Sequence, residues 1–332
     1  MHTLLRWVSA AIALSLGAAV APSGVRAQPA GPGALRLIVE PQAGMAPIDQ
    51  LLGSAHRSVD LEIYELADPV VESILAADAA RGVRVRVILN RVDTEAENAA
   101  AFAYLGARHV AVRWAPLRFD LDHEKAAVID DATALVMTMN LTTRYYPTTR
   151  DVVVVDTQPA DAAAIEATFD GDWGAGGASP APAGEDLLWS PGSEQAIVEL
   201  IDSARRAIDV ENEEMGDASV TEALGRAARR GVRVVVVMTE DRAWHQELAG
   251  LAAAGVEVRT YPDSPAALYI HAKVIAVDPG QTDRRAFVGS ENFSVASLVY
   301  NRELGIVTTR PAIVDALARM VLSDAAGGEV WR

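Results

Sequence analysis

The stretch HEKAAVID, residues 123–130, returns as HAKVIAVD at residues 271–278, and this repeat decides how the chain is organised. Both copies read His-x-Lys-x-x-x-x-Asp. They contain the only two lysines of the 332-residue chain, Lys125 and Lys273, against 27 arginines. An ammonium group kept at two equivalent positions of an arginine-rich protein indicates a task that guanidinium performs poorly. A compact charge on a flexible stem that holds one oxygen of a phosphate fits that task.

In each copy the motif is followed first by an asparagine, which supplies an amide, and then by an acidic residue, which supplies a carboxylate. The first motif is followed by Met-Thr-Met-Asn, ending at Asn140, and the second by Gly-Ser-Glu-Asn, ending at Asn292. Eleven residues beyond each asparagine lies an acid, Asp151 or Glu303, and each acid follows an arginine. Each half of the chain therefore supplies a histidine, a lysine, a hydroxyl, an amide and a carboxylate in one order.

This order of motifs resembles the signature of the phospholipase D superfamily. The second half matches it well, whereas the first half has Met137 for glycine, Thr138 for serine and Asp151 for glutamate. Methionine is bulkier than glycine, so Met137 is expected to crowd the site. The resemblance implies an α/β fold made of a duplicated phospholipase D-like domain, with two layered α/β/α halves related by pseudo-twofold symmetry around one shared cleft. It also implies a two-step reaction through a phosphohistidine, with His123 as nucleophile and His271 as acid.

The halves also align outside the motifs. Residues 58–62 match residues 207–211, and residues 81–85 match residues 230–234, both 149 positions apart. A repeat of this length is a duplicated domain. Segments of strand and helix character alternate in each half, which favours a layered α/β sheet. The predicted strands are 59–63, 83–89 and 232–238, and the predicted helices are 69–80, 94–105 (with Thr94 as N-cap), 221–230 and 242–254.

The start of the chain reads as a targeting segment. Residues 1–27 have a short basic start, an apolar core too short to span a bilayer comfortably, and a Val-Arg-Ala cleavage site, so they predict a signal peptide; a retained anchor is the alternative. The first half is expected at residues 28–173, a Gly/Ala/Ser/Pro-rich linker at 174–185, and the second half at 186–332. The sequence therefore predicts an exported protein, periplasmic or secreted, with no transmembrane segment in the mature chain.

The motif spacing suggests how the polar side chains meet. Side chains two apart on a strand share a face. Histidine and lysine then project together from strands predicted at 123–129 and 271–277, and hydroxyl and amide from return strands at 134–140 and 286–292. Lysines and asparagines, helped by the hydroxyls, are expected to bind the non-bridging oxygens of a phosphodiester. One imidazole attacks phosphorus and the other protonates the leaving oxygen, with no metal and no other cofactor.

The carboxylates receive supporting roles. The acid beyond each asparagine is expected to hydrogen-bond the far ring nitrogen of a histidine and fix its tautomer. Aspartates at turns often bond to backbone, which favours a structural role for the motif aspartates. The predicted catalytic residues are His123, Lys125, Asn140, His271, Lys273 and Asn292, and the predicted supporting residues are Asp130, Thr138, Asp151, Asp278, Ser290 and Glu303.

Four further acids need an interpretation. Glu124 is expected on the opposite face of its strand. The acids Glu211, Glu213 and Glu214 resemble a metal cluster, but no histidine or cysteine lies near them in the sequence. A solvated position, or one at the rim of the cleft, is therefore favoured for these three residues.

The net charge of the chain favours some of the possible substrates over others. Residues 28–332 hold 27 basic and 45 acidic residues, a net charge of −18. Such a surface repels nucleic acid at long range. The first expectation is a phosphodiesterase of phospholipase D type that meets phospholipid transiently at a membrane surface and hydrolyses its head group. The alternatives are a head-group transferase of cardiolipin synthase type and an exported metal-independent nuclease, which would need a basic track. A non-enzymatic scaffold would not need two intact histidine, lysine and asparagine sets.

Overall fold

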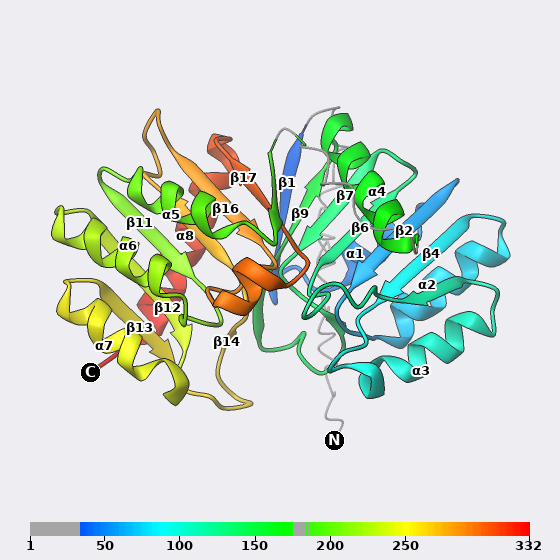
Figure 1. Cartoon of the computed structure of the whole chain (residues 1–332), viewed down its shortest axis with the longest axis horizontal. Coiled ribbons are helices and arrows are strands. Elements are labelled where there is room, and N and C mark those ends of the chain that lie inside the picture. Colours follow the sequence, from blue (N-terminus) through cyan, green and yellow to red (C-terminus); the bar gives the residue numbers. More distant parts are fainter. Residues whose placement is uncertain (1–33, 175–183, 185) are drawn as a thin grey trace, which may run out of the picture.

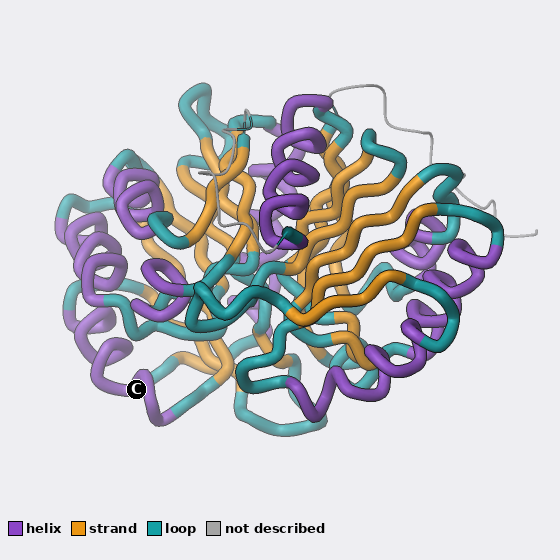
Figure 2. The backbone as a smooth tube through the Cα atoms, turned by 45° about the vertical axis from the view of Figure 1, so that its right-hand side comes forward, coloured by secondary structure: helices purple, strands orange, loops and turns teal. Residues whose placement is uncertain are grey.

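The computed structural model describes residues 34–174, 184 and 186–332. The predicted signal peptide lies outside these residues, and so does nearly all of the predicted linker. Figure 1 shows two α/β halves side by side, with β1, β9 and β17 near their junction. Figure 2 shows the strands of each half as a layer with helices on its outer side. No helix in the described part of the chain combines the length and apolar character needed to cross a bilayer.

The first half is built on a mixed sheet of order β1-β9-β7-β6-β2-β4-β5, to which β14 of the second half adds beside β9. Its strands are β1 (Leu35–Glu40), β2 (Ser58–Ile63), β4 (Arg84–Leu89), β5 (Ala111–Trp114), β6 (Lys125–Ile129), β7 (Thr133–Met137) and β9 (Thr149–Asp156). Two short strands, β3 (Leu66–Ala67) and β8 (Leu141–Thr142), pair separately. The helices are α1 (Ala46–Leu52), α2 (Pro69–Ala80), α3 (Glu95–Gly106) and α4 (Pro159–Trp173).

The second half repeats this order as β10-β17-β16-β15-β11-β12-β13, with β18 added at the edge. Its strands are β10 (Leu187–Ser190), β11 (Ala207–Glu211), β12 (Arg233–Thr239), β13 (Glu257–Tyr261), β14 (Tyr269–Ile270), β15 (Val274–Val277), β16 (Arg285–Gly289), β17 (Glu303–Thr308) and β18 (Glu329–Val330). The helices are α5 (Glu194–Asp202), α6 (Ala218–Arg229), α7 (His245–Ala253) and α8 (Pro311–Gly327), with a 3₁₀ turn η1 (Arg242–Trp244) and a π-turn η2 (Ala296–Tyr300). The matching strand orders confirm the predicted duplication of an α/β domain.

Local signals place most elements where the sequence predicts them. Helix α2 has the predicted bounds, because Pro69 occupies its first turn and the Asp68 side chain accepts the Val70 N–H at 2.8 Å. Thr94 stands at the N-cap position of α3, but its hydroxyl donates to the carbonyl of Tyr64 instead of capping the helix. The helix predicted at 242–254 is divided into η1 and α7.

The motif strands are shorter than predicted. Strand β6 begins after His123, and β15 begins after His271. Both histidines donate their backbone N–H to the other half: His123 to the carbonyl of Arg302 at 2.9 Å, and His271 to that of Arg150 at 3.2 Å. Since these N–H groups form hydrogen bonds to the other half, the histidines do not belong to the strands of their own sheets.

Three apolar clusters hold the layers together. One lies between the first sheet and α1–α3, and another between the second sheet and α5–α7. The third lies between the two sheets and combines residues of both, including Val154 of β9 and Ile306 of β17, with Ile165 of α4 and Leu317 of α8. The halves therefore share a core, and each sheet is covered on both faces in the predicted α/β/α arrangement.

Two buried ion pairs also join the halves. Arg150, at the start of β9, reaches Asp324 of α8 with Nε–Oδ2 at 2.5 Å and Nη2–Oδ1 at 2.9 Å. In the symmetric position Arg302 reaches Asp172 of α4 with Nε–Oδ2 at 2.8 Å and Nη2–Oδ1 at 3.1 Å. The arginine that precedes each acid in the sequence therefore forms a buried ion pair that joins the halves.

We predict that R150M lowers the free energy of unfolding by about 3–5 kcal/mol, because it leaves Asp324 buried without its cation. Urea unfolding measures this change. The control is R91M, which removes an exposed pair with Glu95 at 3.1 Å and is expected to cost no more than about 0.5 kcal/mol. A similar decrease in the free energy of unfolding in both variants would contradict the role of Arg150 in joining the halves.

Candidate active site

Backbone pairing between the halves places each motif histidine beside an acid of the other half. Ile270 pairs in parallel with Arg150, so His271 comes next to Asp151. An isolated bridge between Asp122 and Arg302 does the same for His123 and Glu303. His123 Nδ1 lies 2.8 Å from Glu303 Oε2, and His271 Nδ1 lies 2.8 Å from Asp151 Oδ1. The crossing of these pairs was not specified by the sequence pattern.

The carboxylates orient both rings. An ionised carboxylate only accepts hydrogen bonds, so each ring carries a proton on Nδ1 and turns Nε2 toward the cavity. Burial lowers the pKa of His123, Glu303 opposes that shift, and Lys125 adds to it. Burial alone would raise the pKa of Glu303, but His123 and Lys125 hold it below its usual range. The free site therefore favours an ionised Glu303 beside a neutral His123.

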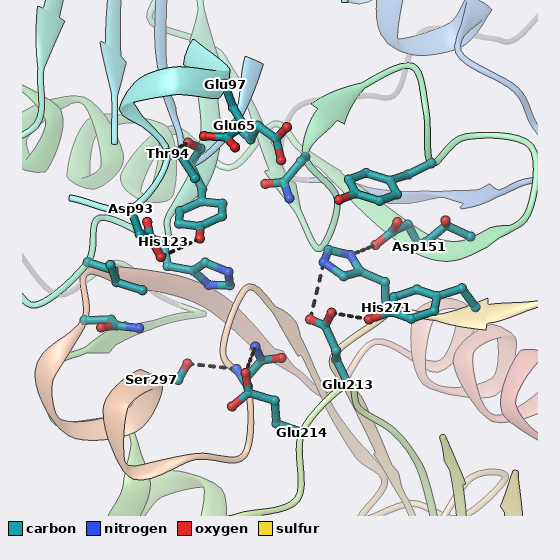
Figure 3. Close-up of a pocket in the computed structure, with 18 of the residues that line it drawn as sticks. Glu65, Asp93, Thr94, Glu97, His123, Asp151, Glu213, Glu214, His271 and Ser297 are labelled. Carbon is teal, nitrogen blue, oxygen red and sulfur yellow. Dashed lines mark hydrogen bonds and ion pairs between the residues drawn. The ribbon is translucent and has the colours of Figure 1, made fainter. Parts of the chain in front are cut away.

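The two rings face one cavity of about 500 Å³ at the junction of the halves. Figure 3 shows His123 and His271 turned toward the same space, with dashed lines from His271 to Asp151 and Glu213. Asn140 and Asn292 line the same cavity. The structure thus brings both predicted histidines and both asparagines together.

The lysines lie beneath this lining. Lys125 and Lys273 are fully buried, and neither is among the described residues that line the cavity. Lys125 Nζ donates to the carbonyl oxygen of His123 at 2.7 Å, and Lys273 Nζ to that of His271 at 2.5 Å. Each lysine thus holds the backbone of the histidine two residues before it. Burial lowers the pKa of Lys125 to about 7, against the opposing charge of Glu303.

The hydroxyls do not face the cavity. Thr138 and Ser290 are buried. Thr138 Oγ1 donates to Asp151 Oδ1 at 2.6 Å and accepts the Val152 N–H at 2.9 Å. Ser290 Oγ accepts the Leu304 N–H at 3.1 Å. Direct help from these hydroxyls in binding phosphate is therefore not observed; Thr138 orients the acid that holds His271.

The motif aspartates close turns. Asp130 accepts the backbone N–H groups of residues 56–58, the shortest at 2.6 Å from Arg57. Asp278 accepts those of residues 205–207 at 2.7–2.9 Å. Both aspartates have positive φ, 55° and 48°. Their position is the structural one that the turn pattern indicates.

Met137 does not crowd the site. Its side chain packs in the apolar core behind the first sheet. The equivalent Gly289 lies against Gly305 and the buried carboxylate of Glu291, which leave no room for a Cβ. In the first half these neighbours are Val153 and a methionine. The glycine-to-methionine change is therefore one part of a packing change, away from the cavity.

One acid lies elsewhere than predicted, and a second is buried on the face away from the cavity. Glu211 is fully buried rather than solvated or at the cleft rim, and burial beside Asp324 raises its pKa well above the usual range. Glu124 is also buried, and burial raises its pKa to about 8. The solvated or rim position predicted for Glu211 is wrong, because each sheet is covered on both faces; Glu124 lies among the buried acids of the first half rather than at the cavity. Glu213 and Glu214, in contrast, line the cavity as predicted.

Glu124 belongs to a buried acidic cluster in the first half. One oxygen each of Glu62, Glu124 and Asp172 lies within 4.8 Å of the others, a spacing that suits a metal ion. Asp172 is already paired with Arg302 at 2.8 Å and with Arg118. Guanidinium groups therefore supply positive charge to this cluster.

The sequence did not single out one pair of residues that distinguishes the halves. Tyr64 and Glu213 occupy equivalent positions 149 residues apart. The Tyr64 ring lies 4.7 Å from the His123 ring and 4.9 Å from Lys125 Nζ. Glu213 Oε2 lies 3.0 Å from Lys273 Nζ and 3.4 Å from His271 Nε2. The alignment of the halves contained this difference, but no motif marked it.

Comparison with known proteins agrees with this geometry. The family model described as "Cardiolipin synthase, PLD-like domain" matches residues 48–173 and again residues 197–324. Phosphatidylserine synthase of Haemophilus influenzae Rd KW20 is similar over 90% of this chain and 87% of its own, with a TM-score of 0.69 and 14% identity. Polyphosphate kinase of Porphyromonas gingivalis is similar over 88% of this chain, with a TM-score of 0.67 and 17% identity; the chain spans 50% of that kinase. No curated protein matches. At these identities the two structures show a common fold.

The site predicts a bell-shaped dependence of kcat/KM on pH, which reports groups of the free enzyme. As the predicted nucleophile His123 has to be neutral, so its lowered pKa puts the acid limb below the usual histidine range. The predicted role of Lys125 requires its charged form, so activity is expected to fall as the pH rises through about 7. In K125R the basic limb is expected to lose the contribution of Lys125 and move up, because arginine stays charged, while the rate falls. An unchanged basic limb would exclude Lys125 as its source.

Proposed function

Because this chain belongs to the phospholipase D-like family, we propose that it is a phosphodiesterase that hydrolyses phospholipid head groups through a covalent intermediate on His123. The observation that carries the proposal is the pair of imidazoles that face one cavity, each held at Nδ1 by an acid of the other half. Two oriented Nε2 atoms meet the need for one nucleophile and one acid. The N-terminal sequence supports export to the periplasm or the medium.

The surroundings of the two rings support the assignment of roles. His271 has a carboxylate near each nitrogen, Asp151 at 2.8 Å and Glu213 at 3.4 Å, which suits a ring that carries two protons. His123 has Glu303 at Nδ1, and burial lowers its pKa. His123 is therefore the nucleophile in our proposal, and His271 is the acid.

The reaction then has two balanced steps. His123 Nε2 attacks phosphorus, the bond from phosphorus to the head-group oxygen breaks, and that oxygen takes the proton of His271 Nε2. Water next attacks the phosphohistidine and gives its proton to His271 while the P–N bond breaks. Phosphatidic acid leaves, and both rings return to their starting states. Asn140, Asn292 and the positive charge of the two lysines stabilise the equatorial oxygens in both steps.

The wall of the cavity favours a lipid substrate over nucleic acid. Arg144 is the one arginine or lysine among the described residues that line it, whereas six carboxylates do so: Glu65, Asp93, Glu97, Asp151, Glu213 and Glu214. A nucleic acid strand brings several phosphates and needs a basic track. A single zwitterionic phosphodiester brings its own cation.

A head-group transferase of cardiolipin synthase type is the second candidate. It uses the same residues, with an alcohol in place of water in the second step. The description of the matching family model favours it. Hydrolysis and transfer are distinguished by supplying glycerol or phosphatidylglycerol as acceptor and identifying the lipid product.

The first test offers purified protein, in chelator, vesicles of phosphatidylcholine or phosphatidylethanolamine and, separately, single-stranded DNA. We expect release of head group from the vesicles and no degradation of DNA. Action on strongly anionic vesicles is expected to rise with salt, because the acidic surface is then screened. Degradation of DNA with no action on any phospholipid would replace the lipid proposal by the nuclease alternative. Loss of activity in chelator, restored by one divalent ion, would overturn the metal-free mechanism.

The second test concerns the histidines. H123A and H271A are each expected to cut turnover by more than about a thousandfold, and their losses should not add, because the two rings act as one unit. In an H271A background, phosphorus-labelled substrate should leave its label on His123. Label on His271 in H123A, with none on His123 in H271A, would reverse the assigned roles.

A further inference from the structure

In the second half, the carboxylate of Glu213 already accepts from the groups that a phosphate oxygen needs as hydrogen-bond donors. Its Oε2 lies 3.0 Å from Lys273 Nζ and 3.4 Å from His271 Nε2, and Tyr269 donates its hydroxyl to Oε1 at 2.7 Å. Figure 3 shows the carboxylate of Glu213 directed at the His271 ring. In the free protein this carboxylate is the counter-ion of the second motif.

The first half has no such counter-ion at the equivalent position. Tyr64 stands there, and its hydroxyl donates to Asp93 at 2.9 Å, away from Lys125. The two motifs therefore start from different states, although their histidines, lysines and asparagines match. A phosphate can approach the first motif without displacing a carboxylate at this position, but the second motif must release Glu213.

The displaced carboxylate needs a new partner. The side chain of Glu213 is only 24% exposed. Burial alone would raise its pKa, but Lys273 and His271 hold the pKa well below the usual range, so Glu213 is ionised in the free site. A partly buried carboxylate that loses its cation is destabilised, since little water replaces the lost partner.

We propose that Glu213 is a specificity-determining residue: substrate phosphate displaces its carboxylate from Lys273 and His271, and the carboxylate then pairs with a cationic head group. The inference rests on the proposed function and adds the substrate class, phosphodiesters whose leaving alcohol carries an ammonium. A neutral or anionic head group leaves Glu213 without a cation. Tyr269 and Tyr145 also line this cavity, and aromatic faces attract ammonium groups.

The first experiment measures binding of inorganic phosphate by calorimetry to wild type, E213Q and E97Q. Glu97 lines the same cavity but is exposed, and its substitution removes the same charge. Without the competing carboxylate, E213Q is expected to bind phosphate about tenfold more tightly, and E97Q within about twofold of wild type. Equal affinities in wild type and E213Q, or an equal gain in E97Q, would overturn the displacement.

The second experiment compares kcat/KM for phosphatidylcholine with kcat/KM for phosphatidylglycerol. The ratio is expected to fall about tenfold or more in E213Q, and to be kept in E97Q and in E213D, which retains the charge. The ratio separates specificity from any general loss of turnover or folding. An unchanged ratio in E213Q would overturn the inference.

The outcomes of the two experiments distinguish failure of the proposed function from failure of the inference. If wild type cleaves no phospholipid, the proposed function fails, and phosphate binding still decides whether Glu213 is displaced. If wild type cleaves phospholipid and E213Q alters neither phosphate binding nor the ratio, the inference alone fails.

Discussion

The site depends on one type of interaction, the backbone hydrogen bond from each motif histidine to the arginine of the other half. His123 N–H donates to Arg302 and His271 N–H to Arg150. The residue after each arginine is the acid that holds the imidazole, and the arginine side chain reaches back to the aspartate of a helix. One dipeptide, Arg-Asp or Arg-Glu, therefore joins the halves and orients the ring. Neither half contains the acid of its own histidine, so the arrangement exists only when both halves are docked.

The duplicated halves keep the residues that we propose to bind phosphate and differ around them. Histidine, lysine and asparagine match in both. Behind the sheet, Gly289, Glu291 and Gly305 are replaced in the first half by bulkier apolar residues, which fill the same space without a buried carboxylate. In the cavity, Glu213 occupies the position equivalent to Tyr64. Two chemically different histidine environments arise in this way from one repeat, as a reaction with one nucleophile and one acid requires.

Much of the fold follows from local signals in the sequence. Helix α2 begins at a proline behind an aspartate cap and has its predicted bounds. The duplication predicts two equivalent sheets, and the order of motifs predicts which polar residues meet. The ends of the motif strands were not predictable. The alternation of side chains along a strand does not reveal that the backbone N–H of His123 donates to the other half.

Burial of polar groups was the least predictable property. Glu211 ends an alternating stretch, Ile208-Asp209-Val210-Glu211, that is typical of a strand with one exposed face. It is nevertheless buried, and so is Glu124, because α4 and α8 cover that face of the sheets. Thr138 has the spacing of a residue that faces the cavity, but its hydroxyl is used by Asp151 and the backbone of Val152. Such assignments depend on contacts far apart in the chain, which a motif does not contain.

The buried lysines offer a physical account of the anion binding that we propose for this acidic protein. At rest Lys273 is neutralised by Glu213, and Lys125 has a pKa of about 7, so part of its population is uncharged. The positive charge is therefore balanced or absent until a phosphate arrives. Two negative oxygens near these lysines favour the charged form of Lys125 and compete for Lys273. In the proposed reaction the attraction is generated where the phosphate lies, inside the cavity, while the acidic wall and surface repel ligands that bring many phosphates at once.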